Sequence, residues 1–270
     1  MTVFDSPVPG DCCQAFAESY EVSSLPEMRD IERSVLGCDY GGTSWTTARQ
    51  AQAMAAAIEL ASDDTLLEIG AGSGWPGLYF AKLIGRHVVL LDLPHNALQK
   101  ARRRASADGI SCQIGLVAAS GAALPFADDT FPAISHSDVL CCLPEKKQVL
   151  RECRRVARAG ATMVFAVIYV PQGLDAVDRQ RSLAAGPPFL DAAASYEDML
   201  AVTGWQVTNK DDVTDEYRDS LVALVDGIRT SKGLRARLGE STAEESISQR
   251  EEQIRVIEQG FMRRAVYHCR

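Results

Sequence analysis

A cluster of glycines flanked by two acids holds the residue types best suited to binding a ligand. Glu68 opens the stretch, Asp92 closes the next apolar run, and the glycines between them are Gly70, Gly72, Gly74 and Gly77. Glycine has no Cβ, so such a turn lets a ligand lie against bare backbone. A carboxylate at the tip of a strand can accept hydrogen bonds from both hydroxyls of a ribose. The pattern therefore predicts a site for a nucleotide-like ligand.

Two glycine fingerprints overlap in this stretch. Gly72, Gly74 and Gly77 fit G-x-G-x-x-G, the dinucleotide fingerprint, with an acid close to the expected distance beyond it. The pattern E-x-G-x-G-x-G, which starts at Glu68, is also present. Because the spacing satisfies both patterns, the choice between them depends on the rest of the chain.

Strand and helix signals surround the glycines as an α/β fold requires. Thr65–Ile69 is a short apolar run that predicts a buried strand, and Pro76 suits the first turn of the helix after it. Thr43 or Ser44 is expected to cap an alanine-rich helix before the strand. Further strands are expected at 87–91, 112–117, 162–169, 204–210 and 261–269, and helices at about 45–60, 78–84, 95–107, 196–202, 214–228 and 243–259.

Three later segments decide between the two fingerprints. ALPFADDTF (123–131), SDVLCCLP (137–144) and VLRECRRVARAG (149–160) follow the glycines in order. With E-x-G-x-G-x-G, this succession over about 66–170 resembles the class I S-adenosylmethionine-dependent methyltransferases, in particular those of ubiquinone and menaquinone biosynthesis. The resemblance implies an α/β fold with a Rossmann-like seven-stranded sheet whose last strand is antiparallel. This order of motifs is not expected in a dehydrogenase fold.

Additions flank that core on both sides. Residues 1–60 are expected to form a helical N-terminal cap and 61–170 the S-adenosylmethionine-binding core. Residues 171–270 should supply a substrate-covering loop, a helical insertion and the closing strands of the same sheet. Tyr20, Thr46 and Arg49 could offer polar groups to a ligand's carboxylate, although solvent contact is the simpler expectation for each. The arginines of 151–158 share one helix face and are expected to be solvated.

The resemblance implies a set of cofactor-binding residues, with S-adenosyl-L-methionine as methyl donor and S-adenosyl-L-homocysteine as product. They are Glu68, Gly70, Ala71, Gly72, Ser73, Gly74, Asp92, Leu93, Ser120, Gly121 and Ser137. Two positions depart from the family pattern. Ser120 replaces the usual acid near the adenine, and Cys141-Cys142 replaces a Glu-His pair. A hydroxyl can still accept the adenine hydrogen bond, but without charge assistance.

Methyl transfer from a sulfonium is an in-line displacement, to which a protein contributes mainly orientation and exclusion of water. His136 and Asp138 are the candidate catalytic bases, on one side of the fourth strand; a buried, non-catalytic histidine is the alternative for His136. The acceptor is expected to be an O, N or C atom of a small molecule. Two alternatives are a non-catalytic S-adenosylmethionine-binding sensor or partner protein, and an NAD(P)-dependent oxidoreductase.

The composition of the chain indicates which kinds of partner it can bind and in which cell compartment it is expected. The net charge of −8 argues against nucleic-acid binding, which requires a basic face. The longest apolar run, 163–170, is too short to cross a bilayer, and the first residues lack a signal-peptide pattern. None of the eight cysteines forms a C-x-x-C pair, and no cluster has metal-ligand spacing. We therefore expect a cytoplasmic monomer or homodimer with reduced thiols and without a metal.

Overall fold

The computed structural model describes residues 12–270, which contain a mixed β-sheet of seven strands. The strand order is β3-β2-β1-β4-β5-β7-β6, and β7 pairs antiparallel with both β5 and β6. The strands are β1 (Thr65–Ile69), β2 (His87–Asp92), β3 (Ile114–Ala118), β4 (Phe131–Ser137), β5 (Ala157–Tyr169), β6 (Val207–Asp212) and β7 (Arg263–Cys269). This topology confirms the predicted fold class, including the antiparallel last strand.

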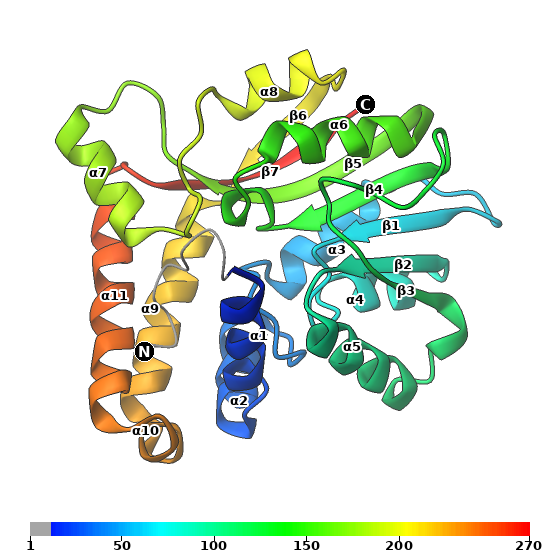
Figure 1. Cartoon of the computed structure of the whole chain (residues 1–270). Coiled ribbons are helices and arrows are strands. Elements are labelled where there is room, and N and C mark those ends of the chain that lie inside the picture. Colours follow the sequence, from blue (N-terminus) through cyan, green and yellow to red (C-terminus); the bar gives the residue numbers. More distant parts are fainter. Residues whose placement is uncertain (1–11) are drawn as a thin grey trace.

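Helices cover both faces of the sheet, and a separate helical group stands beside it (Figure 1). One face carries α3 (Ala48–Ala56), α4 (Gly77–Ile84) and α5 (His95–Ala107), and the other carries α6 (Lys146–Val156) and α8 (Tyr196–Val202). The helical group contains α1 (Cys12–Ser23), α2 (Pro26–Leu36), α9 (Thr214–Thr230), α10 (Lys232–Leu238) and α11 (Glu240–Glu258), with α7 (Ala176–Ala185) packed against α11. None of the helices in 12–270 combines the length and apolar composition that crossing a membrane requires.

Side-chain alternation along the strands builds one apolar layer on each face of the sheet. In β1, Leu66 packs into the layer under α3, α4 and α5, whereas its neighbour Leu67 packs into the layer under α6 and α8. A third cluster, which includes Ile31, Val225 and Ile247, joins α2 to α9 and α11. The helical group is therefore packed through its own apolar core.

The strand order creates a crevice between β1 and β4. The chain runs from β1 outward to β2 and β3, and then returns to place β4 on the other side of β1. In open α/β sheets, ligands bind outside the carboxyl ends of the strands at such a switch point. The end of β1, where the glycines begin, lies at this position.

The helix before β1 is shorter than predicted and has a different cap. It starts at Ala48, and Thr47 caps it in a capping box with Gln50. The prediction of Thr43 or Ser44 as cap is wrong because Ser44 and the Trp45 amide hydrogen-bond Asp138 instead. The helix thus begins later in the sequence because residues 44 and 45 hydrogen-bond a residue that is distant in sequence, Asp138.

The predicted solvated face of arginines is only partly solvated: Arg151 and Arg158 are exposed, whereas Arg154 and Arg155 are half-buried. Arg155 donates to the carbonyl oxygens of Leu124 at 2.9 Å and Phe126 at 2.8 Å, which fixes the loop before β4. The Arg154 guanidinium lies over the Trp205 ring, 5.4 Å from its centroid. The last arginine of the run belongs to β5, which begins five residues before the predicted position of 162.

Candidate functional site

A cavity of about 270 Å³ lies at the carboxyl ends of β1, β2 and β4. Its walls come from residues 70–73 of the glycine turn, from 92–94 at the end of β2, and from 137–139 and 141–143 at the end of β4. Tyr20 of α1, the segment 42–45, the loop 186–188 and one face of α11 complete it. The cavity therefore joins the sheet core to the N-terminal helices and the C-terminal insertion.

The first two glycines of the turn are required by the conformation and by close contacts. Gly70 has a φ of 64° and Gly72 a φ of 53°, a left-handed conformation that side chains disfavour. A Cβ on Gly70 would lie 2.3 Å from Cγ2 of Val139, and one on Gly72 would lie 2.4 Å from Oη of Tyr20. The turn thus exposes bare backbone to the cavity, and Tyr20 of α1 packs directly against the turn.

Asp92 connects the end of β2 to this turn. Its carboxylate accepts hydrogen bonds from the backbone N–H of Gly72 at 2.6 Å and of Leu93 at 2.7 Å. Burial raises the pKa of Asp92 to about 6, and these two hydrogen bonds oppose the shift. The predicted ribose-binding acid therefore lies on the cavity wall and holds the turn in place.

Asp138, at the end of β4, is held by a buried network that the sequence did not predict. Its φ is 58°, and its carboxylate accepts two hydrogen bonds from Arg264 of β7, at 2.9 and 3.0 Å. Ser44 Oγ and the Trp45 N–H donate two more, at 2.9 and 2.8 Å. Arg264 is fully buried and also donates to Thr46 at 2.8 Å. With four hydrogen bonds, the Asp138 carboxylate is arranged to hold the cap and not to take a proton from an acceptor.

His136 is in the wrong place for a catalytic base. Its side chain is fully buried in the sheet and stacks on Phe165, with ring centroids 4.5 Å apart. Neither ring nitrogen has a hydrogen-bond partner within residues 12–270, and the residue does not line the cavity. Burial lowers the pKa of His136 to about 3, which keeps the imidazole neutral. The alternative of a buried, non-catalytic histidine fits this geometry.

Glu68 lies beneath the glycine turn and does not reach the cavity. Its side chain is 1% exposed and accepts a hydrogen bond from Ser135 Oγ on β4. A Cβ on Gly77 would lie 3.0 Å from its Cγ, so Glu68 also packs against the start of α4. Burial raises the pKa of Glu68 to about 8. The carboxyl group is therefore a supporting element of the turn.

The remaining predicted cofactor residues divide into two groups. Four of them line the cavity: Ala71, Ser73, Leu93 and Ser137. The Ser137 hydroxyl is buried and has no hydrogen-bond partner within the described part of the chain. Three do not line it: Gly74, which packs under Leu78, and Ser120 and Gly121 in the loop after β3.

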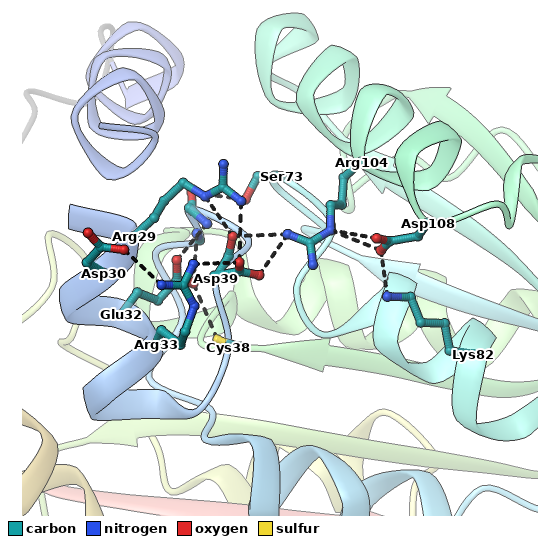
Figure 2. A network of polar contacts seen from close by, with 12 residues as sticks. Arg29, Asp30, Glu32, Arg33, Cys38, Asp39, Ser73, Lys82, Arg104 and Asp108 are labelled. Carbon is teal, nitrogen blue, oxygen red and sulfur yellow. Dashed lines mark hydrogen bonds and ion pairs between the residues drawn. The ribbon is translucent and has the colours of Figure 1, made fainter. Parts of the chain in front are cut away.

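A second polar network holds the segment that forms the rim of the cavity (Figure 2). Glu32 of α2 accepts hydrogen bonds from the backbone N–H of Gly41 at 2.7 Å and of Gly42 at 3.3 Å. Ser73 of the turn donates to the Gly41 carbonyl at 3.0 Å. Asp39 pairs with Arg33, Arg29 and Arg104, which links α2 to α5. These contacts fix 39–42 against the turn.

The polar residues suggested for the cap have different roles in the structure. Tyr20 lines the cavity and contacts the glycine turn. Thr46 is fully buried against Arg264, and Arg49 pairs with Glu216 of α9, so neither lines the cavity. Sequence reasoning missed Arg264 and Arg250, which contribute from β7 and α11. A cation inside the apolar run of β7 is a usable signal for Arg264, whereas local spacing gives none for Arg250.

Comparisons with known proteins agree with this architecture. A family model described as "Methyltransferase domain" matches residues 67–165. Methyltransferase GfsG of Streptomyces halstedii is 27% identical over 174 residues, 62% of each protein. A ubiquinone/menaquinone biosynthesis C-methyltransferase of Hahella chejuensis is 34% identical over 102 residues, 37% of this chain and 41% of that protein. The predicted resemblance is confirmed.

A solved structure extends the similarity beyond the core. The phosphoethanolamine N-methyltransferase 2 of Haemonchus contortus superposes with a TM-score of 0.76 at 14% identity, covering 94% of this chain and 60% of that one. At this identity the likeness concerns the fold alone. The chain spans less than two thirds of GfsG, so the match to that protein leaves more than a third of it uncovered. Residues 67–165 of this chain match the methyltransferase domain family, and they lie in a seven-stranded sheet with the fold of solved methyltransferases.

Proposed function

We propose that the chain is an S-adenosylmethionine-dependent methyltransferase that acts on an O, N or C atom of a small molecule. One observation carries this proposal. The glycine turn, the Asp92 carboxylate and the buried Ser137 hydroxyl face a single cavity at the switch point of the sheet. Such a cofactor can use all three groups: bare backbone beside its methionine portion, an acid for its ribose hydroxyls, and a hydroxyl group that can form a further hydrogen bond.

The cavity residues fit the cofactor at each of its parts. The backbone of residues 70–73 would hold the methionine portion, Asp92 the ribose hydroxyls and Leu93 a face of the adenine. Ser137 would contact the methionine portion or the acceptor, and Glu68 supports the turn from below. Ser120 and Gly121 stay candidates for the adenine edge, from the family resemblance. When bound, S-adenosylmethionine supplies an activated methyl group on a positively charged sulfur.

The contribution of the chain is positioning and exclusion of water. Arg264 and Asp138 lock the cap segment over the cavity, and Tyr20 packs against the glycine turn. Such enclosure aligns two reactants and keeps water from the reacting atoms. The proposal needs no general base among the described residues, because a sulfonium methyl group is already a strong electrophile.

The volume of the cavity, about 270 Å³, supports a small-molecule acceptor. Relatives whose names refer to small molecules, such as the ubiquinone/menaquinone biosynthesis C-methyltransferase of Hahella chejuensis, also favour a small-molecule acceptor. The proposal includes a cytoplasmic location, which suits the free thiols of the described cysteines. It also includes the division into a cap (1–60), a core (61–170) and a covering region (171–270).

Isothermal titration calorimetry with S-adenosylmethionine, S-adenosylhomocysteine and NADH tests the proposal. We expect both sulfur compounds to bind and NADH not to bind. Binding of NADH alone would support the oxidoreductase alternative. Product formation across phenols, amines and quinol precursors would then separate an enzyme from a sensor or partner protein that binds the cofactor without turnover.

A further inference from the structure

A second cavity, of about 170 Å³, adjoins the first and is lined by residues of α1, α2, α9 and α11. The two cavities share Phe16, Ser19 and the segment 42–45. Residues 70–73 and Asp92, which are assigned to the cofactor, line the first cavity and do not line the second. The second cavity therefore offers space that the cofactor groups do not reach.

The walls of the second cavity are mainly apolar. The side chains from the two helices that face each other across it are Met28, Ile31, Val35 and Leu36 of α2, and Leu224 and Ile228 of α9. Most of them belong to the apolar cluster that joins α2 to α9 and α11. A ligand that enters this cavity exchanges water for apolar side chains, which favours hydrocarbon groups.

Ser246 of α11 supplies an uncharged polar group to this cavity. The residue lines the cavity, is 2% exposed, and its Oγ has no hydrogen-bond partner within residues 12–270. A buried hydroxyl without a partner is unfavourable, and a ligand that supplies the missing hydrogen bond removes that cost. A carbonyl or hydroxyl oxygen of the ligand can do so without bringing a charge into the cavity.

The acids that line the two cavities are engaged by other groups of the chain. Asp138 is paired with Arg264, and Asp92 accepts from two backbone amides. Glu32, in the second cavity, accepts from the backbone amides of residues 41 and 42. A cationic ligand would have to displace one of these contacts to gain a counter-charge.

Arg250 of α11, which lines both cavities, is engaged as well. Its Nη1 donates to Gln253 at 3.3 Å, and its guanidinium carbon lies 5.8 Å from the centroid of the Trp45 ring. An anionic ligand would have to compete with the contacts that already hold this side chain. Because removing a charge from water is costly unless a counter-charge compensates it, the two cavities favour a ligand without net charge.

We propose that the methyl acceptor is an uncharged, mainly apolar molecule whose body occupies the second cavity and whose carbonyl or hydroxyl oxygen accepts a hydrogen bond from Ser246. This inference rests on the proposed methyl transfer and adds the class of the acceptor to it. Alcohols, phenols and enols belong to this class. An aliphatic amine is protonated at neutral pH and falls outside it.

Three probes with one carbon skeleton test the preference for a neutral ligand. At pH 7, 4-butylbenzyl alcohol is neutral, 4-butylbenzoate is an anion and 4-butylbenzylamine is a cation. Each is titrated by calorimetry into the protein saturated with S-adenosylhomocysteine. We expect the alcohol to bind about ten-fold or more tightly than either ion. Across the methyl, ethyl, propyl and butyl members of the alcohol series, each added methylene should tighten binding about two- to four-fold.

Two substitutions test the assigned contacts. Leu224→Phe fills part of the second cavity, so it should weaken binding of the butyl alcohol about ten-fold and remove the dependence on chain length. Ser246→Ala should weaken binding of every alcohol about two- to ten-fold. Val222→Phe is the matched control, because Val222 lies on the same helix as Leu224, is 42% exposed and lines neither cavity. It should bind the alcohols as the unaltered protein does.

Tighter binding of either ion, or no binding of any alcohol, would overturn the inference alone. A chain-length dependence that survives Leu224→Phe would also overturn it, and so would unchanged affinity for the alcohols in Ser246→Ala. A loss of S-adenosylhomocysteine affinity in Leu224→Phe would assign the second cavity to the cofactor and not to the acceptor. Failure of the unaltered protein to bind S-adenosylhomocysteine would overturn the proposed function as well.

Discussion

At the scale of single residues, the half-buried Asp92 and the buried Glu68 both have raised pKa values but have different roles. Asp92 faces the cavity and bonds the backbone of the turn, whereas Glu68 lies under the turn against Ser135. Burial raises the pKa of Asp92 to about 6 and that of Glu68 to about 8. Near neutral pH, Asp92 is therefore mainly ionised and Glu68 mainly protonated.

The charge of Asp92 should control cofactor affinity. Asp92→Asn keeps the shape but weakens the acceptor, so we expect a loss of about 1.5–3 kcal/mol in binding of S-adenosylhomocysteine at pH 8. In the unaltered protein, affinity should fall as the pH drops below about 6, because the carboxyl group then takes up a proton. Calorimetry from pH 5 to 8 measures both effects. Asp226→Asn, at an exposed position on α9, is the control. An Asp92→Asn protein with unchanged affinity would refute the ribose assignment.

The protonation of Glu68 should make stability depend on pH. Its folded-state pKa of about 8 is above the ordinary value of 4.5, so folding retains a proton that the unfolded chain releases. This stabilisation is complete below about pH 4.5 and is lost as the pH rises through 8. We expect Glu68→Gln to be more stable than the unaltered protein at pH 9, by about 2–5 kcal/mol, and nearly equal to it at pH 5.

Urea unfolding at the two pH values measures this difference. Glu59→Gln serves as the control, because Glu59 is exposed and should not alter the pH dependence. If Glu68→Gln loses stability with rising pH as steeply as the unaltered protein, the titrating group is a different one.

At the scale of elements, one buried ion pair connects three parts of the chain that are distant in sequence. Arg264 of β7 bonds Asp138 after β4, and both bond the segment before α3. Removing one partner of a buried pair leaves an uncompensated charge. Loss of either Arg264 or Asp138 should therefore weaken the contacts among β7, the end of β4 and the segment before α3 at the same time.

Arg264→Met should lower the free energy of unfolding by about 3–5 kcal/mol. The double variant Arg264→Met, Asp138→Asn should recover part of that loss, because it no longer buries a lone carboxylate. Arg263→Met is the matched control, since Arg263 is the neighbouring residue and pairs with Asp212 at an exposed position. Denaturant unfolding distinguishes them. Equal effects of the two single substitutions would mean that the Arg264 pair has no special role.

The glycine turn permits a second matched comparison. Gly72→Ala places a methyl group against the Tyr20 hydroxyl, whereas Gly173→Ala has the same positive sign of φ and meets nothing within 4 Å. Both should lose about 1 kcal/mol of stability from backbone strain. Only Gly72→Ala should also abolish binding of S-adenosylhomocysteine by calorimetry. Retained binding in Gly72→Ala would show that the ligand does not use this turn.

At the scale of the whole molecule, local signals predicted the core and long-range contacts determined the site. The turn that starts at Gly70 and the acid at Asp92 both belong to the continuous unit β1–α4–β2, and the sequence placed both correctly relative to the sheet. The partner of Asp138 lies 126 residues away, so no spacing rule could reveal it. This ion pair makes Asp138 unsuited as a base, and the hydrogen bonds that Ser44 and the Trp45 amide donate to the same carboxylate explain why α3 starts late.

Burial explains the other differences. Whether His136 faces the cavity or the core depends on how the faces of β4 are covered, and the sequence left both possibilities open. The wall that α11 contributes to the cavity is separated in sequence from the glycine turn by most of the chain. Amphipathic periodicity predicts such a helix but not the cavity that it faces.

A crystal structure of the complex with S-adenosylhomocysteine tests the central claim most directly. We predict that the ligand occupies the cavity at the ends of β1, β2 and β4, with its ribose hydroxyls on Asp92 and its amino-acid portion along residues 70–73. The sulfur should then face the part of the cavity that leads to α11. A ligand bound away from the glycine turn, or a ribose that does not contact Asp92, would contradict the account.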